Sequence, residues 1–226
     1  MTLERLLILP AAGSSQRMGF DKLWQDVDGR PVLAWTLQAV ARAETFDVVC
    51  IAAQKERWED IERLARDEGI EHLLLCEGGH RRQDTVRSAL EEATSAEFVS
   101  IHDAARPLCS PRLFRAVLAK AQQTMAATAA LPCTDTVKRV NGDVISETLP
   151  REELMTVQTP QAFSTALLRD AHREALSQGW RVDDDAELVE RMGWPVHVVT
   201  GERRNIKLTY ASDFEFFRAL RLEEAE

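Results

Sequence analysis

The stretch LLILPAAG, Leu6 to Gly13, is a short apolar run that ends in two alanines and a glycine. An unbroken apolar run such as Leu6–Leu9 is typical of a strand that is covered on both faces of a sheet. Similar runs recur along the chain, at Val48–Ala53, Leu73–Cys76, Phe98–Ile101, Ala126–Leu131 and Val196–Val199. We therefore expect these runs to form a buried, mainly parallel sheet.

Segments with helical periodicity lie between most of these runs, at Pro31–Arg42, Glu56–Glu68, Gln83–Ala93 and Pro111–Gln123. Pro31 and Pro111 suit the first turn of a helix, Ser110 suits a helix cap, and Gly69 and Gly193 stand where helices should end. Strands that alternate with helices predict right-handed crossovers. We expect a doubly wound α/β fold with a twisted sheet, which binds ligands beyond the carboxyl ends of its strands.

Length and composition indicate one soluble globular unit. The chain has 226 residues, of which 45% are hydrophobic and 29% charged, and we expect one domain over residues 1–226. The formal net charge of -9 argues against a nucleic-acid partner, so any anion must be bound locally. The four cysteines have no zinc or redox spacing. Because no run approaches the roughly 20 apolar residues that span a bilayer, we expect a cytoplasmic protein without a membrane partner.

The segment TVKRVNGDVISETLP, Thr136 to Pro150, interrupts the alternation of strands and helices. Asn141-Gly142 lies between two alternating runs, which predicts a tight antiparallel hairpin. The hairpin is too polar for the core of a sheet. It is either a surface hairpin at the sheet edge or an arm that packs on a second subunit, and the residues alone leave both open.

The end of the first strand has the residues that a polyphosphate requires. Ala11, Ala12 and Gly13 allow close approach of the backbone, and Arg17 and Lys22 follow in the same loop. Phosphoryl transfer develops negative charge that cations and usually Mg²⁺ stabilise. Neither the dinucleotide nor the P-loop glycine pattern is present, which argues against an NAD-dependent dehydrogenase.

Two later segments also lie at strand ends. Gly78 and Gly79 allow contact with a flat base, and Thr85 offers a hydroxyl at a helix start. HDAARP follows the strand Phe98–Ile101, and a carboxylate in the position of Asp103 suits Mg²⁺. The alternatives are a helix cap for Asp103 and a structural ion pair for Arg106. His102 is expected to be a hydrogen-bonded core or rim residue that takes no part in catalysis.

Six short motifs follow one another along the chain. They are AAG…RM…K from Ala11 to Lys22, GGHRRQDTV from Gly78, HDAARP from His102, PCTDTVK from Pro132, Arg151 with TPQ from Thr159, and NIKLT from Asn205. In this order and spacing the chain resembles the cytidylyltransferases that act on methylerythritol phosphate and ribitol phosphate. The resemblance covers nearly the whole chain.

The resemblance implies transfer of CMP from CTP to 2-C-methyl-D-erythritol 4-phosphate, with release of pyrophosphate, in non-mevalonate isoprenoid biosynthesis. The alternative is ribitol 5-phosphate cytidylyltransferase. A nucleotide-binding regulatory protein without catalysis is disfavoured because Arg17 and Lys22 are both retained. The family's fold is a Rossmann-like nucleotidyltransferase fold with a protruding hairpin arm, here residues 136–150, which implies a homodimer.

Site roles follow from the resemblance alone. The catalytic residues would be Arg17, Lys22, Arg151 and Lys207, with Arg151 supplied by the neighbouring subunit. CTP would contact Ala11, Ala12, Gly13, Ser14, Ser15, Arg17, Lys22, Gly79, Thr85, Asp103 and Ala104. The sugar or polyol phosphate would contact Asp103, Arg106, Thr136, Arg151, Asp183 and Lys207, and Asp103 would bind Mg²⁺.

The chain departs from the family pattern in two places. The opening loop is short and has Asp21 where a proline usually precedes the lysine. In VDDDA, Val182 to Ala186, Asp183 replaces the usual threonine. A carboxylate there repels a phosphate unless it accepts sugar hydroxyls. Alternatively, Asp183–Asp185 form an acidic first turn stabilised by the helix dipole.

Overall fold

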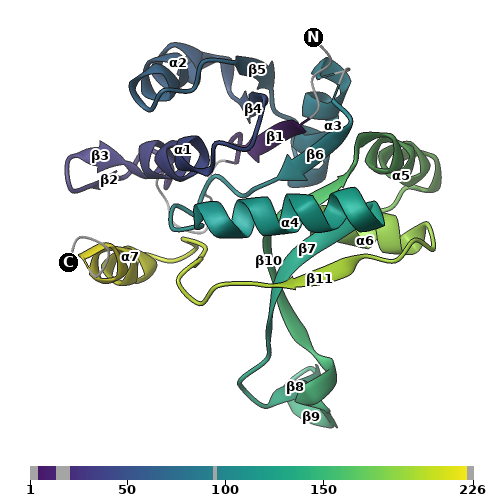
Figure 1. Ribbon diagram of the computed structural model, residues 1–226. Helices are drawn as coiled ribbons and strands as arrows, with labels where there is room; N and C mark the ends of the chain where they lie inside the picture. The colour runs from purple at the N-terminus through teal and green to yellow at the C-terminus, as the bar shows by residue number, and fades with distance from the viewer. Residues whose placement is uncertain (1–4, 14–20, 94–95, 223–226) are drawn as a thin grey trace.

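The computed structural model describes residues 5–13, 21–93 and 96–222. In this part of the chain a seven-stranded sheet has the order β11-β7-β10-β6-β1-β4-β5 (Figure 1). Its strands are β1 (Arg5–Pro10), β4 (Val48–Ala53), β5 (Leu73–Glu77), β6 (Phe98–Ile101), β7 (Ala126–Pro132), β10 (Met155–Ser164) and β11 (His197–Thr200). Every predicted strand is present, with ends within one residue of the prediction.

The sheet is mainly parallel, as predicted. β1 is parallel to β4 and β6, β4 to β5, and β11 to β7. β10 lies between β6 and β7 and is antiparallel to both. This strand was not predicted, because its sequence MTVQTPQAFS mixes polar residues and a proline into a buried element.

Helices cover both faces of the sheet (Figure 1). α1 (Val32–Ala43), α2 (Trp58–Asp67), α4 (Pro111–Thr124) and α7 (Asp213–Leu222) pack on one face, and α3 (Arg82–Glu92), α5 (Thr165–Gln178) and α6 (Asp185–Arg191) on the other. Leu7 and Leu9 join the first core, and Leu6 and Ile8 the second. Successive residues of one strand thus fill opposite cores, which confirms the doubly wound fold.

The helix ends agree with the predictions, with two exceptions. The Ser110 hydroxyl accepts a hydrogen bond from the Leu113 N–H at 3.1 Å, and Pro111 begins α4. Pro31 stands at the cap of α1, one residue before the first turn, because it pairs with Asp26 in a small ribbon. The predicted helix Glu56–Glu68 begins as a short 3-10 helix, η1 (Lys55–Arg57), which leads into α2.

Two small ribbons stand apart from the main sheet. β2 (Asp26–Val27) pairs with β3 (Arg30–Pro31). β8 (Val137–Asn141) pairs with β9 (Val144–Leu149) through a turn in which Gly142 has a φ of +64°, so the predicted hairpin is confirmed. The β8–β9 hairpin projects from the body of the molecule, and η2 (Arg151–Glu153) connects it to β10 (Figure 1).

None of the helices within the described ranges is long and apolar enough to cross a membrane.

Candidate active site

The loops that follow β1, β5 and β6 meet at a cleft of about 880 Å³. This is the carboxyl edge of parallel strands, where α/β folds bind ligands. The cleft brings together predicted site residues from distant parts of the chain, namely Ala12, Gly13, Lys22, Gly79, Thr85, Asp103, Ala104, Asp183 and Lys207. Ala11 lines a neighbouring pocket of about 220 Å³, which shares Ala12 and Gly13 with the cleft.

Other predicted residues are not part of this cleft. Ser14, Ser15 and Arg17 lie outside the described residues. Thr136 and Arg151 are exposed next to the β8–β9 hairpin and do not line the cleft of their own chain. The Arg151 guanidinium donates through Nη1 to the Thr134 carbonyl at 3.1 Å.

One wall of the cleft is a tight glycine turn. A Cβ on Gly78 would lie 2.1 Å from the Cβ of Ala12, and one on Gly79 would lie 2.5 Å from the Cβ of Asp84. The Thr85 hydroxyl accepts from the Gly79 N–H at 3.1 Å, so it orders the turn. The wall therefore presents backbone to a ligand, as contact with a flat base requires.

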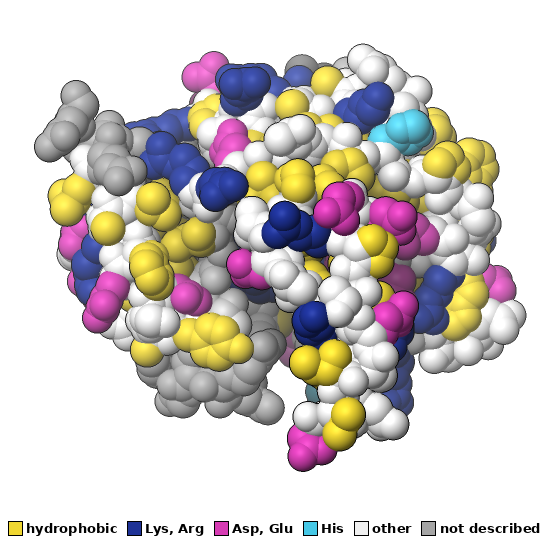
Figure 2. All heavy atoms as spheres, turned by 90° about the horizontal axis from the view of Figure 1, so that it is seen from below, with side chains coloured by type: hydrophobic (Ala, Val, Ile, Leu, Met, Phe, Trp, Pro, Cys, Tyr) yellow, Lys and Arg dark blue, Asp and Glu magenta, His cyan; other side chains and the backbone are white. Residues whose placement is uncertain are grey.

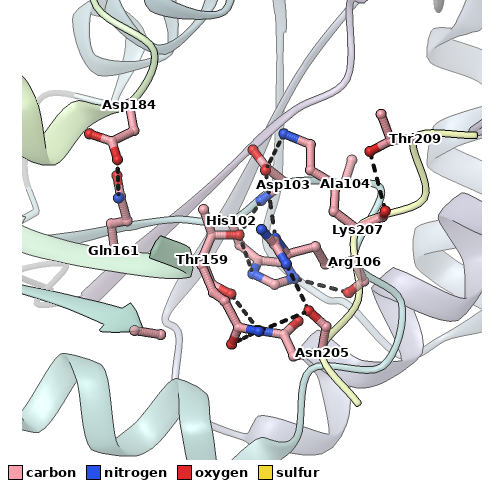
Figure 3. A network of polar contacts seen from close by, with 12 residues as sticks. His102, Asp103, Ala104, Arg106, Thr159, Gln161, Asp184, Asn205, Lys207 and Thr209 are labelled. Carbon is pink, nitrogen blue, oxygen red and sulfur yellow. Dashed lines mark hydrogen bonds and ion pairs between the residues drawn. The ribbon is translucent and has the colours of Figure 1, made fainter. Parts of the chain in front are cut away.

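Asp103 follows the end of β6 and contacts three cations, of which Figure 3 shows Arg106 and Lys207. Its Oδ1 lies 3.1 Å from Arg82 Nε, and its Oδ2 lies 2.7 Å from Lys207 Nζ and 3.7 Å from Arg106 Nε. The side chain is 11% exposed. Burial opposes the charge, but the three cations hold the pKa of Asp103 far below its ordinary range. Asp103 is therefore an anion in the floor of the cleft, and its side chain makes ion pairs.

A buried network fixes the loops on either side of Asp103 (Figure 3). The Asp103 N–H donates to the Thr159 hydroxyl at 2.9 Å. Arg106 is buried behind the cleft, and its Nη1 donates to the Asn205 carbonyl at 2.7 Å. These contacts agree with the structural role that was the alternative to substrate binding for Arg106. The Asn205 amide donates to the Thr159 carbonyl at 2.8 Å. These bonds join the loop after β6 to β10 and to the segment that carries Lys207.

His102 is a buried core residue, as predicted. Its Nε2 lies 3.1 Å from the Arg106 carbonyl, which only accepts, so Nε2 carries the proton. Its Nδ1 lies 3.1 Å from the Thr159 hydroxyl, which therefore donates. Burial lowers the pKa of His102 to about 4, so the ring is neutral.

The acidic turn around Asp183 has three distinct environments. Asp183 is exposed and lines the cleft. Asp184 caps α6, where its Oδ1 accepts from the Glu187 N–H at 2.9 Å. Asp185 is buried and accepts from Arg82. The helix-turn alternative thus holds for Asp184, the cap of α6, and for Asp185, its first residue, whereas Asp183 faces the cleft.

Arg82 and Asp185 are residues of this site that the sequence did not predict. Arg82 occurs in the quoted GGHRRQDTV motif and Asp185 in VDDDA, but no pattern indicated that they pair. Arg82 lines the cleft, and its guanidinium contacts both Asp103 and Asp185.

Lys22 connects the opening loop to the last part of the site. Its Nζ donates to the Leu208 carbonyl at 2.9 Å, next to Lys207. Two lysines from opposite ends of the chain therefore line one cleft of an acidic protein. Such a local concentration of positive charge suits a polyphosphate.

The residues of the cleft fit a metal ion that is held mainly by the phosphates of a bound substrate and by few protein side chains. Among the residues that the structure describes, no group of three or more His, Cys, Asp or Glu side chains could hold a metal ion. Asp103 is ionised and lines the cleft, but both of its oxygens contact cations. Mg²⁺ often binds one or two carboxylates together with phosphate oxygens and water. Asp103 could supply one such oxygen after Lys207 shifts toward a phosphate, and its role as a metal ligand stays a prediction.

Comparison with known proteins gives one family. Residues 6–221 match the family described as 2-C-methyl-D-erythritol 4-phosphate cytidylyltransferase (IspD). The proteins of that name from Synechococcus sp. strain JA-3-3Ab and Bacillus cytotoxicus are 44% and 40% identical to this chain. The alignments cover 90% and 92% of this chain and 91% and 93% of those proteins.

Solved structures that are similar to this chain belong to the same family. The 2-C-methyl-D-erythritol 4-phosphate cytidylyltransferase of Thermus thermophilus is 36% identical, with a TM-score of 0.78 over 97% of this chain and 98% of that one. The 4-diphosphocytidyl-2C-methyl-D-erythritol synthase of Anaerococcus prevotii is 28% identical, with a TM-score of 0.87 over 98% of this chain and 100% of that one. The resemblance seen in the sequence is confirmed, and the chain belongs to the 2-C-methyl-D-erythritol 4-phosphate cytidylyltransferase family of nucleotidyltransferase enzymes.

Proposed function

We propose that this chain transfers CMP from CTP to 2-C-methyl-D-erythritol 4-phosphate and releases pyrophosphate. The observation that carries the proposal is the meeting of Lys22, Asp103 and Lys207 in one cleft beside a glycine turn, in a member of this family. The names of the relatives favour this substrate over ribitol 5-phosphate. We expect the enzyme to act in the cytoplasm and as one domain with a hairpin arm.

The reaction needs positioning and charge more than a general base. A phosphate oxygen of the acceptor attacks the α-phosphorus of CTP, and the bond from that phosphorus to the bridging oxygen of the β-phosphate breaks. Pyrophosphate leaves with the electron pair. The attacking phosphate is already ionised at neutral pH, so no side chain has to remove a proton.

The residues divide between the two substrates. Ala12 and Gly79 would contact the nucleotide through backbone, and Lys22 together with Arg17 would neutralise the triphosphate. Lys207 would bind the phosphate of the acceptor through its compact positive charge, and Asp103 would accept a hydrogen bond from a hydroxyl group of the acceptor. The short ion pair between Lys207 and Asp103 supports this arrangement, because it holds the ammonium at the floor of the cleft.

Enzymes of this family generally use a divalent metal. We propose Mg²⁺, held by the triphosphate and by one oxygen of Asp103. When bound, it would neutralise charge on the phosphate oxygens and orient them. Chelation with excess EDTA should abolish pyrophosphate release, and added Mg²⁺ should restore it. Full turnover in EDTA would contradict the metal.

The substrate is tested by measuring pyrophosphate release with CTP and either 2-C-methyl-D-erythritol 4-phosphate or ribitol 5-phosphate. We expect kcat/KM to be at least 100-fold higher for the first, and preference for ribitol 5-phosphate would overturn the proposal. Lys207→Met should reduce turnover at least 100-fold, whereas the matched control Lys120→Gln on α4 should not. Unchanged turnover in Lys207→Met or in Arg17→Ala would contradict the catalytic role given to that residue. Wild-type protein that binds CTP but releases no pyrophosphate with either acceptor would instead favour a site that binds nucleotide without catalysis.

Asp183 would accept hydrogen bonds from hydroxyl groups of the sugar phosphate. It is exposed at the cleft, and its N–H lies 3.4 Å from Glu187 Oε2. An Asp183→Thr variant should change the KM for the acceptor by threefold or more and leave the KM for CTP unchanged. A change confined to the KM for CTP would contradict this role.

We propose that the protein is a homodimer in which Arg151 and Thr136 complete the cleft of the partner. Support comes from the exposure of Arg151 away from its own cleft and from apolar side chains that are 59–64% exposed on the hairpin, at Val140, Val144 and Ile145. Figure 2 views the side on which the hairpin projects, where apolar side chains alternate with charges of both signs. Such a mixture suits a protein interface.

The dimer is tested by mixing two inactive variants, Lys207→Met and Arg151→Ala. In a mixed dimer one cleft would have both defects and the other neither. After subunit exchange at equal concentrations, activity should rise to about a quarter of the wild-type value, since half of the dimers are mixed and each has one intact site. Absence of recovery, with subunit exchange verified, would show that each chain uses its own Arg151.

A further inference from the structure

Arg82 joins two carboxylates that come from different parts of the fold. It is the first residue of α3, and its side chain is 24% exposed. Its Nη1 lies 2.7 Å from Asp185 Oδ2, and its Nε lies 3.1 Å from Asp103 Oδ1. Because a guanidinium is planar, these two contacts fix its orientation.

Asp185 is held by Arg82 and by its own backbone, and it lies next to a buried histidine. Its side chain is 1% exposed, and its N–H donates to Gln161 Oε1 at 3.2 Å. Its second oxygen, Oδ1, lies 3.3 Å from Nε2 of the buried His172 on α5. Asp185 does not line the cleft, so it is a fixed point behind the site to which Arg82 is anchored.

The contacts form a chain from this fixed point to the floor of the cleft. Asp185 holds Arg82, Arg82 holds one oxygen of Asp103, and the other oxygen of Asp103 lies 2.7 Å from Lys207 Nζ. If Asp185 loses its charge, the guanidinium has one carboxylate left and is free to turn onto Asp103 or toward the phosphates. Either movement would change the position of Asp103 relative to Lys207.

We propose that Asp185 is a positioning residue for nucleotidyl transfer, which acts through Arg82 to orient the Asp103 carboxylate and the Lys207 ammonium toward the acceptor phosphate. This inference rests on the proposed function and adds to it a residue that does not touch substrate. It predicts that Asp185 affects the chemical step more than the binding of CTP.

The alternative is that Asp185 only stabilises the start of α6. Removing one partner of a buried ion pair often destabilises a protein strongly. Thermal stability alone therefore cannot distinguish the two roles. A double-mutant cycle in kcat distinguishes them, because a residue that acts through Arg82 loses its effect once Arg82 is removed.

The experiment compares the wild type with Asp185→Asn, Arg82→Gln and the double variant, at a temperature at which circular dichroism shows each to be folded. We expect Asp185→Asn to lower kcat tenfold or more with less than a threefold change in the KM for CTP. The double variant should be no slower than Arg82→Gln. The matched control is Asp170→Asn, which neutralises an exposed carboxylate on α5 that pairs with Arg173 and should retain wild-type kcat.

Two results would overturn the proposal. One is a wild-type kcat in folded Asp185→Asn, which would leave Asp185 a structural role alone. The other is a double variant whose loss in kcat is the product of the two single losses. If Asp185→Asn does not fold, Arg82→Lys provides the same test, since one ammonium does not reproduce both contacts, and a wild-type kcat there would also overturn it.

The wild-type assay separates this test from that of the proposed function. If wild-type protein releases no pyrophosphate with 2-C-methyl-D-erythritol 4-phosphate, the proposed function fails. If the wild type is active and the cycle is multiplicative, the proposed function stands and the positioning role fails.

Discussion

Protonation of His102 should destabilise this protein in mild acid. The ring is fully buried, and burial lowers its pKa to about 4 from an ordinary value of 6.5. Between these two pH values the unfolded chain binds a proton at this residue and the folded chain does not. The folded state is therefore favoured above pH 6.5, and this stabilisation is lost as the pH falls toward 4.

The magnitude follows from the two pKa values. One pKa unit corresponds to about 1.4 kcal/mol, so the full effect is about 3 kcal/mol. At pH 5 about 2 kcal/mol of it should already be lost relative to pH 8. This is a large part of the roughly 5–15 kcal/mol that stabilises a typical domain.

Urea denaturation at pH 8 and pH 5 measures the effect, in the wild type and in a His102→Gln variant that has no ring to protonate. Other groups titrate in both proteins and cancel in the comparison. We expect the free energy of unfolding of the wild type to fall by about 2 kcal/mol more than that of the variant. The control is His80→Gln, which removes an exposed histidine and should keep the wild-type pH dependence. Equal pH dependence in the wild type and His102→Gln would refute the reasoning.

Three further predictions concern the cleft and α4. Gly78→Ala should raise the KM for CTP at least tenfold, because the added Cβ would lie 2.1 Å from the Cβ of Ala12 and the wall must shift; an unchanged KM in steady-state kinetics would contradict this. Ser110→Ala should lower the free energy of unfolding by about 1–2 kcal/mol, because the Leu113 N–H loses its cap and Glu202 loses the hydrogen bond from the Ser110 hydroxyl; urea denaturation checks this, and kcat should not change. Lys22→Met should lower kcat/KM for CTP about 100-fold with little loss of stability, since in the proposed mechanism Lys22 is a cation that stabilises the transition state; a variant that loses activity only because it is largely unfolded at the assay temperature would indicate a structural role instead.

The sheet could be predicted where apolar residues alone determine burial. Runs such as Leu6–Leu9 and Val48–Ala53 are covered on both faces, and their composition reports this directly. β10 is also buried, but Gln158, Thr159 and Gln161 are polar. Their burial is tolerated because tertiary partners satisfy them, as where the Gln161 amide donates to the Thr128 hydroxyl at 3.1 Å. No local pattern in the sequence reports such partners.

The same distinction applies to the site. Asp103 and Lys207 could be predicted because each lies in a motif of recognisable order. The pair of Arg82 and Asp185 joins residues 103 positions apart and exists only when the first turns of α3 and α6 meet in the fold. Local spacing contains no information about that contact, so a structure was needed to find it.

The central place of β10 has a consequence for the order in which a nascent chain becomes an enzyme. β6 and β7 do not pair with each other, since β10 lies between them and contributes its backbone to both. A growing chain that has not yet reached residue 155 therefore exposes one edge of β6 and both edges of β7, because β11 also comes later, and Lys207 emerges later still. During translation the amino-terminal half of the sheet therefore has unpaired strand edges until β10 is synthesised. Chaperones bind chains with exposed edges of this kind.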